Sequence, residues 1–187
     1  SFVPLALISL VVSFKTVEGF NTILQNNQAT TKNMILTQLN NESENLLELS
    51  KAYAADPSLL EAFERGDWRK LEEGAIPVFE RMEREHQLSI FEFGSIDGKV
   101  FFRAHNREKY GDDKSDLPAI QAALKGEELS GFEFGASGLS VRAFVPVVKD
   151  NKVIGTLQTG LAPEVIQTIA ASFSGVLINI VNSEGTI

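Results

Sequence analysis

The sequence contains no cysteine, and this absence excludes disulfides, thiolate metal ligands and cysteine nucleophiles. Basic residues are in the minority: 17 Lys and Arg stand against 25 Asp and Glu, which gives a net charge of −8. Nucleic acids bind basic surfaces, so this balance argues against a nucleic-acid partner. The 187 residues have room for one ordinary domain, and a hydrophobic content of 43% is enough to bury a core.

Motifs that carry chemistry are also scarce. Only two histidines are present, and a metal site built from His105, Asp112 and Asp113 is weaker than another interpretation. We expect the two carboxylates to accept backbone hydrogen bonds within their own loop and to cap the helix near Pro118. No glycine-rich phosphate loop follows a predicted strand, and no serine lies in a nucleophile signature. We therefore expect no enzyme, no metal and no cofactor.

Charge is absent from residues 1–14, SFVPLALISLVVSF, and Lys15 ends this run. A helix that spans a membrane needs about 20 apolar residues, so the run is too short to span by itself. Its composition fits the outer end of a transmembrane helix that starts upstream. A buried core helix and the remnant of a signal peptide are the two alternatives.

Proline is missing between Lys15 and Ala55, and Gly19 is the only glycine there. Apolar residues recur in this stretch at spacings of three, four and seven, at Val17, Phe20, Leu24, Ile35, Leu39, Leu46, Leu49 and Tyr53. The pattern predicts one long helix over residues 15–55, with a role in signalling and dimerisation. The alternative is a plain amphipathic helix that packs on its own domain.

The pattern changes after Asp56-Pro57, where the chain turns to short elements. Helices are predicted over Ser58–Arg65, Trp68–Gln87 (with Gly74 and Pro77 as points where it divides), Pro118–Lys125 and Pro163–Phe173. Strands are predicted over Ile90–Gly94, Lys99–Ala104, Leu129–Phe134, Leu139–Val148 and Lys152–Gly160. The predicted fold class is α+β, a long N-terminal helix packed on a PAS-like five-stranded antiparallel sheet, with the lobe over residues 56–162.

Residues 163–187 follow this lobe as a connecting helix and one further strand. The stretch VLINIVNSEGTI echoes FEFGSIDGKV, since both have a strand, an acidic residue, a glycine and an apolar residue. We interpret residues 176–187 as the first strand of a truncated second lobe. The alternative is a sixth strand that closes the first sheet.

The two faces of the first hairpin differ in character. With Asp97-Gly98 as a two-residue turn, Glu92 lies opposite Arg103 and Phe93 opposite Phe102. The predicted core face carries Phe91, Phe93, Val100, Phe102 and Ala104, and the other face carries Ile90, Glu92, Phe101, Arg103 and His105.

Both faces of the last hairpin are largely apolar, so both need a cover. One face is predicted to carry Arg142, Phe144, Val148, Val153 and Leu157, and the other Val145, Val147, Ile154 and Thr156. The long helix is expected to cover one face and residues 105–125 the other, with a small-molecule cavity between that segment and the sheet.

Arg142 has apolar neighbours in this register, so its charge needs an anionic partner. With Ala136-Ser137 as the turn, Glu133 shares its face and supplies that partner; the alternative is that Arg142 anchors an anionic ligand. The residues expected to contact a ligand are Phe101, Arg103, His105, Tyr110, Asp112, Asp113, Glu133, Arg142 and Phe144.

The stretch FRAHNREKYGDDKSD, with SGFEFGASGLSVRAFVPVVKDNKVIGTLQTG after it, resembles the extracytoplasmic Cache sensor domains of bacterial chemoreceptors, histidine kinases and diguanylate cyclases. The matching positions are Arg103, His105, Tyr110, Gly111, Asp112, Asp113, Gly131, Glu133, Gly135, Pro146, Gly155 and Gly160. The resemblance covers roughly residues 45–187 and is closest to the double-Cache type. Arg107 stands where this pattern commonly has a proline.

This resemblance implies a sensor in the periplasm or extracellular space that is anchored in the inner membrane, most often that of a methyl-accepting chemotaxis receptor. Its expected partner is either a small ligand, of which an anion is one version, or a periplasmic binding protein. A second copy of the chain is also expected, paired through the long helix. The alternative function is a structural, dimerisation or partner-binding module of a sensor kinase or diguanylate cyclase that binds no ligand.

Overall fold

The computed structural model describes residues 3–135 and 138–173. The chain divides into two units, one up to Gln38 and one from Leu39 onwards. Helix α1 runs over Val3–Ala54, and its residues from Leu39 belong to the second unit, which we call the lobe. The prediction of one long N-terminal helix is confirmed. In the part of the chain that is described, no helix combines the length and the apolar character needed to cross a membrane.

Two further helices follow, and an aspartate caps the first turn of each. Helix α2 covers Pro57–Glu64, and the Asp56 carboxylate accepts hydrogen bonds from the N–H groups of Ser58 and Leu59. Helix α3 covers Trp68–His86 and is capped by Asp67. It runs without a break through Gly74 and Pro77, so the expected division does not occur.

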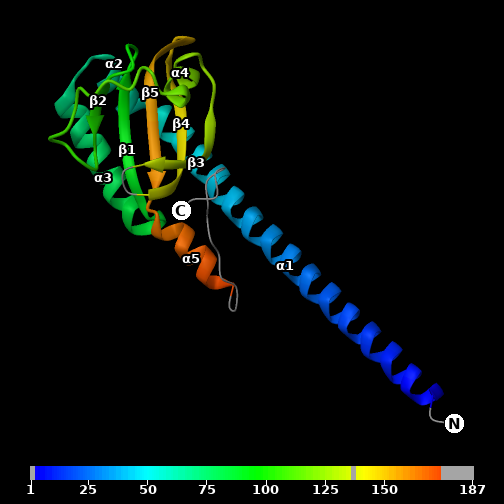
Figure 1. Cartoon of the computed structure of the whole chain (residues 1–187). Coiled ribbons are helices and arrows are strands. Elements are labelled where there is room, and N and C mark those ends of the chain that lie inside the picture. The colour runs from blue at the N-terminus through cyan, green and yellow to red at the C-terminus, as the bar shows by residue number, and fades with distance from the viewer. Residues whose placement is uncertain (1–2, 136–137, 174–187) are drawn as a thin grey trace. The chain divides into compact units, whose positions relative to one another are not determined.

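The lobe is built on one antiparallel sheet in the order β2-β1-β5-β4-β3, which Figure 1 shows. The strands are β1 (Leu88–Ser95), β2 (Val100–Arg103), β3 (Leu129–Gly135), β4 (Gly138–Lys149) and β5 (Lys152–Leu161). Helix α4 (Pro118–Leu124) lies between β2 and β3 in the chain, and α5 (Glu164–Ser172) follows β5. The predicted α+β fold class is confirmed.

The inner face of the sheet packs on the first three helices through aromatic rings. Phe91, Phe93 and Phe102 are fully buried. Their rings contact Tyr53 of α1, Phe63 of α2 and Trp68 of α3, with centroids 5.9, 5.2 and 5.5 Å apart. Large buried aromatic rings supply much of the burial energy of a domain of this size, so these contacts fix the helices on the sheet.

A buried pair of hydroxyl groups also joins α1 to the sheet. The Ser50 and Thr159 hydroxyl oxygens are 2.6 Å apart, and Ser50 donates to the Leu46 carbonyl of its own helix. Both side chains are almost fully buried. Because a serine is small, helix α1 lies close to β5 at this point.

Two irregularities in the pairing of the strands change which side chains share a face. In the first hairpin the register shifts between Phe93 and Gly94, which leaves Phe101 without a direct partner. In the last hairpin it shifts between Val147 and Val148. A shift by one residue moves a side chain to the opposite face of a sheet.

These shifts overturn four expectations, two in each hairpin. Phe101 lies against Phe63 of α2, with ring centroids 5.4 Å apart, and not on the face of Arg103. Leu157 pairs with Val145 and shares its face, and not that of Phe144, while Thr156 pairs with Pro146 and shares the face of Phe144. Of the five residues expected in the core of the first hairpin, Phe91, Phe93, Phe102 and Ala104 are buried on that face, but Val100 pairs with Gly94 and is buried on the opposite face. The predicted start of a second lobe at residues 176–187 lies outside the described residues.

Candidate functional site

The outer face of the sheet, on the side of α4, carries a row of side chains that crosses all five strands. In the order of the strands the row reads Arg103, Glu92, Gln158, Phe144 and Leu129, since each residue pairs with the next. Its first three members are polar and its last two are apolar. The outer face therefore has a polar half over β2, β1 and β5 and an apolar half over β4 and β3.

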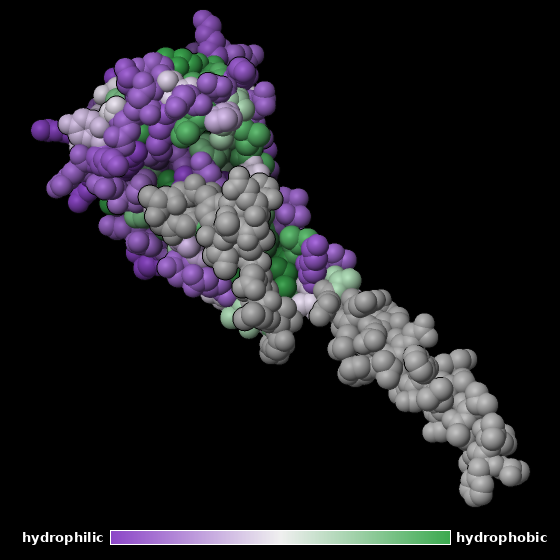
Figure 2. Space-filling view, in the orientation of Figure 1, coloured by the Kyte–Doolittle hydropathy of each residue, from purple (hydrophilic) through white to green (hydrophobic). Residues whose placement is uncertain are grey.

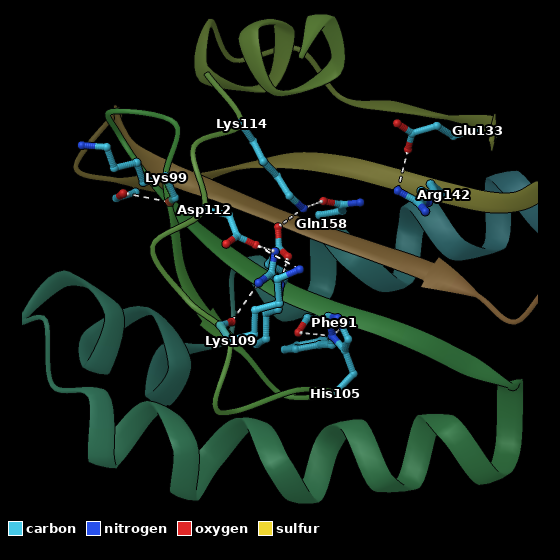
Figure 3. Close-up of polar contacts among 12 residues, drawn as sticks. Phe91, Lys99, His105, Lys109, Asp112, Lys114, Glu133, Arg142 and Gln158 are labelled. Atoms are coloured by element: carbon cyan, nitrogen blue, oxygen red, sulfur yellow. Dashed lines mark hydrogen bonds and ion pairs between the residues drawn. The ribbon is translucent and has the colours of Figure 1, made fainter. Parts of the chain in front are cut away.

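The polar half is filled by a network of buried charges. Arg103 Nε donates to Glu92 Oε2 at 2.6 Å, and Lys114 Nζ donates to Glu92 Oε1 at 2.6 Å and to Gln158 Oε1 at 3.0 Å. The side chains of Arg103 and Glu92 are only 7% and 4% exposed. Figure 3 shows Lys114 reaching down to Gln158 from the chain that leads into α4. We call Glu92, Arg103, Lys114 and Gln158 the buried network.

Asp112 extends this network at its exposed side. Its Oδ2 lies 2.7 Å from Arg103 Nη2, and this hydrogen bond lowers the pKa of the Asp112 carboxyl. Burial works against the charge of Arg103, but the carboxylates of Glu92 and Asp112 outweigh it and raise the pKa of the guanidinium. Both groups are therefore charged at neutral pH.

The loop between β2 and α4 is held to the edge of the sheet. Arg103 Nη1 donates to the Lys109 carbonyl at 2.8 Å. The backbone of residues 111–114 pairs with the hairpin: the Val100 N–H donates to the Asp112 carbonyl at 2.9 Å, and the Gly111 N–H to the Val100 carbonyl at 2.8 Å. The expected lid is thus an ordered strap with several anchors.

His105 lies apart from the buried network. Its Nδ1 accepts a hydrogen bond from the Phe91 N–H at 3.2 Å, and its ring lies beside Phe79 of α3, with centroids 6.3 Å apart. Figure 3 shows it below the sheet with Phe91, on the side of α3. Burial lowers the pKa of this imidazole. The structure therefore places His105 on the helix side and not on the face of Arg103.

Three other predicted residues also lie away from a common site. Tyr110 is 65% exposed on the loop. Asp113 accepts a hydrogen bond from the Ser115 N–H at 3.0 Å, as expected for a carboxylate that orders its own loop. The expected helix cap is wrong, because the residue at the N-cap of α4 is Leu117 and no side chain caps the helix by a hydrogen bond. Phe101 lines a different hollow, beside Phe63 and Ile96.

The apolar half carries an open groove of about 390 Å³ between α4 and strands β3 and β4. Its lining residues are Leu117, Pro118, Ala119, Ala122, Leu129, Ser130, Gly131, Phe132, Glu133, Arg142 and Phe144. Figure 2 shows hydrophobic residues at the surface over α4 and the neighbouring strands, within a largely hydrophilic surface. The expected cavity under residues 105–125 thus exists, but at the α4 end of that segment.

Arg142 and Glu133 are the charged residues of the groove. Arg142 Nη1 donates to Glu133 Oε2 at 2.9 Å, and Arg142 Nε donates to Ser140 Oγ at 3.2 Å. The Arg142 side chain is 13% exposed and that of Glu133 is 35% exposed. The predicted pairing of the two residues is confirmed, and Figure 3 shows them apart from the buried network.

The structure therefore brings together Glu133, Arg142 and Phe144 in the groove, and it joins Asp112 to Arg103 at the exposed side of the buried network. The sequence interpretation missed Lys114 and Gln158, which lie 22 and 44 residues from their partners. It also missed the apolar wall of α4. The residues of that wall are Leu117, Pro118, Ala119 and Ala122, and a helix of seven residues is a weak signal in a sequence.

Comparison with known proteins gives the family. Residues 24–163 match the double-Cache family described as the double sensory domain of two-component sensor kinases. No curated protein matches the chain.

Several solved sensor domains share the fold. The sensor domain of DcuS from Escherichia coli is 18% identical, with a TM-score of 0.59 over 72% of this chain and 98% of that one. The sensor domain of the histidine kinase DctB from Vibrio cholerae is 12% identical, with a TM-score of 0.67 over 79% of this chain and 59% of that one.

A third similar structure is the ligand-binding domain of the Campylobacter jejuni chemoreceptor Tlp3, determined in complex with 4-methylisoleucine. It is 17% identical, with a TM-score of 0.55 over 76% of this chain and 58% of that one. The chain thus spans nearly all of the DcuS domain but less than two thirds of the other two. The family match covers most of the chain, and the resemblance noted in the sequence is confirmed: this protein belongs to the double-Cache family of sensory domains.

Proposed function

We propose that this chain is the extracytoplasmic ligand-sensing part of a bacterial transmembrane signal transducer, and that it binds a small molecule in the groove between α4 and strands β3 and β4. The groove carries this proposal, because it is open, largely apolar and provided with a few polar groups, as small-molecule sites commonly are. The family description points to a sensor kinase as the output, and a chemotaxis receptor is the alternative output.

The signal leaves the lobe through helix α1 in this proposal. Neighbouring residues of β5 face opposite sides of the sheet: Gln158 contacts Lys114 on the outer face, and Thr159 contacts Ser50 of α1 on the inner face. On β1, Glu92 and Phe91 have the same arrangement, since Phe91 contacts Tyr53 of α1. A change on the outer face is thus one residue away from the contacts that hold α1.

Anchoring in the inner membrane and pairing of two copies through α1 are part of the same proposal. The uncharged start of the sequence supports the anchor. Met34 is an exposed apolar residue of α1, at 55%, which supports the pairing of two such helices.

A second candidate function is a structural or partner-binding module that takes no small molecule. The observation that favours it is the buried network, because the protein's own side chains fill the polar half of the outer face. A periplasmic binding protein is the partner that this version requires.

A thermal-shift screen of the whole chain separates the two candidates. Amino acids, carboxylates, amines and purines form the panel. A ligand at about 100 times its Kd stabilises the fold by about 2.7 kcal/mol, a shift of about 5–10 °C in Tm. Ala122→Phe fills the groove and removes the shift. Ala52→Phe, at an exposed position of α1, serves as the control and keeps it. A panel without any shift contradicts direct sensing and favours the partner-binding module.

A further inference from the structure

The groove distinguishes between classes of ligand through its one ion pair. Its walls are otherwise apolar: Leu117, Pro118 and Ala122 come from α4, Leu129 from β3, and Phe144 forms its floor. A molecule that fills this groove gains by burying a hydrocarbon body. The polar group of such a ligand can be an anion that takes the place of Glu133 beside Arg142, or a cation that takes the place of Arg142 beside Glu133.

The two partners differ in what their displacement costs. Arg142 is 13% exposed, so a cation that took its place beside Glu133 would leave a buried guanidinium without a counter-ion. Glu133 is 35% exposed on an edge strand, so its carboxylate can turn into water when an anion takes its place. Replacing the acid therefore costs less than replacing the base.

The space beside Arg142 also favours an incoming group. Gly131 of β3 pairs directly with Arg142, and a Cβ atom built at Gly131 meets no other atom within 4 Å. Gly160 pairs with Arg142 on the other side and has no side chain either, although Ile90 fills that space. The guanidinium is thus open on the side of β3 and of the groove.

The hydrogen-bonding capacity of Arg142 is only partly used. Its Nε and Nη1 have partners in Ser140 and Glu133, and among the described residues Nη2 has none. A guanidinium presents a planar set of donors that matches the two oxygens of a carboxylate. A ligand carboxylate can thus form a two-point contact where Glu133 forms one hydrogen bond.

We infer that the groove takes a small carboxylate with an apolar body, bound through Arg142 in place of Glu133. This inference rests on the proposed function, because it names the ligand class of the proposed site. Glu133 then acts as an internal competitor that occupies Arg142 while the groove is empty. A ligand of this class frees the Glu133 side chain when it binds.

Three probes with the same six-carbon body test the inference: hexanoate, hexylammonium and hexanol. Binding to the whole chain is measured by NMR titration, which reports affinities in the millimolar range. Hexanoate is expected to bind about tenfold or more tightly than either of the other two, the factor that hydrogen bonds to a charged group supply. Equal binding of hexanol, or tighter binding of hexylammonium, overturns the inference but leaves a small-molecule site in place.

Variants of the ion pair give results of opposite sign. Arg142→Gln is expected to weaken hexanoate about tenfold or more, while Glu133→Gln strengthens it several-fold because the competing carboxylate is gone. Glu127→Gln makes the same change of charge at an exposed position and leaves the affinity unchanged. A loss of hexanoate affinity in Glu133→Gln overturns the inference, because the removal of a competing carboxylate should strengthen binding and not weaken it.

Gly131→Val provides a variant that keeps both charges. A valine fits a strand well, and it fills the space beside Arg142. Hexanoate binding is expected to fall at least tenfold, with the unfolding midpoint unchanged or higher. If no probe binds the wild type at any soluble concentration, the carboxylate inference fails. The broader panel described above then decides separately whether the chain is a sensor of another ligand class.

Discussion

The two halves of the outer sheet face are covered in different ways, one by buried charges and the other by an apolar helix. Each must cover strands with side chains from the segment between β2 and β3. Over β2, β1 and β5 the chain supplies charges that fill the space, with Lys114 and Arg103 sharing Glu92. Over β4 and β3 helix α4 supplies small apolar residues and leaves a groove. The comparison shows that one half of this face is closed by charged side chains of the chain itself while the other half stays open.

The difference lies in what each half loses when a side chain is removed. A buried charge depends on its partners, because the partner that remains is left unpaired away from water. A half-exposed charge at a groove is solvated when its partner leaves. The polar half is therefore expected to be rigid and the apolar half to be adaptable.

The largest effect is expected from Glu92→Ala. It leaves Arg103 and Lys114 without the carboxylate that they share, and removing one partner of a buried ion pair costs about 3–5 kcal/mol. Urea unfolding measures the change. Arg142→Ala is the matched substitution in the groove: it leaves Glu133, which is 35% exposed and can be solvated, and is expected to cost about 1 kcal/mol or less. Equal losses in the two variants would remove the distinction between the halves.

A pair of glycines gives the next largest difference. A Cβ at Gly94, on the outer face of β1, would lie 2.6 Å from the Thr156 hydroxyl, while one at Gly131 meets nothing within 4 Å. Gly94→Ala is expected to destabilise the lobe by about 1–3 kcal/mol through overpacking. Gly131→Ala is expected to stabilise it by about 0.5 kcal/mol because alanine suits a strand better than glycine. The unfolding midpoints check the sign, and a loss at both positions would contradict the open groove.

The stability of the lobe at mildly acidic pH tests the environment of His105, which lies on the side of α3. Burial lowers the pKa of His105 in the folded state below the ordinary histidine value of about 6.5. Below pH 6.5 the unfolded chain then binds a proton that the folded chain does not, so stability falls with pH by at most about 1.4 kcal/mol per unit. Unfolding curves from pH 8 to pH 5 measure this slope.

His105→Gln is expected to flatten the slope between pH 6.5 and 5. His86→Gln, at the exposed end of α3, is the control that keeps it. An unchanged slope in His105→Gln would show that another group is responsible.

The smallest effect concerns how each half is coupled to α1. Ser50→Ala removes the hydroxyl that contacts Thr159 and is expected to cost about 1 kcal/mol. A double-mutant cycle with Lys114→Ala should give a coupling of about 0.5 kcal/mol or more, since Gln158 lies next to Thr159. The cycle of Ser50→Ala with Glu133→Ala should be additive within about 0.5 kcal/mol. If the cycle with Glu133→Ala gave the larger coupling free energy, the contacts of α1 would be coupled to the groove and not to the buried network.

Local sequence patterns predicted much of the lobe. The Asp97-Gly98 signal correctly placed Glu92 opposite Arg103. The short turn before Gly138 correctly placed Glu133 beside Arg142, because the register of a tight hairpin follows from its turn.

The failures have physical causes that such patterns do not contain. A register shift depends on packing across strands, so the positions of Phe101 and Leu157 could not follow from the turns alone. Lys114 meets Glu92 because the loop folds back along β2, and this contact joins residues far apart in the chain. His105 lies two residues past Arg103, the last residue of β2, where the alternation of faces stops.

The strap along β2 has a consequence for the solubility of the protein. Residues 111–114 pair with the backbone at that edge, so the other edge, strand β3, is the one that no strand covers among the described residues. Its sequence is LSGFEFG, and Glu133 is its only charge. Exposed edge strands without charge tend to add further strands from other molecules. The carboxylate that occupies Arg142 is therefore also the group that discourages one lobe from extending its sheet into the next.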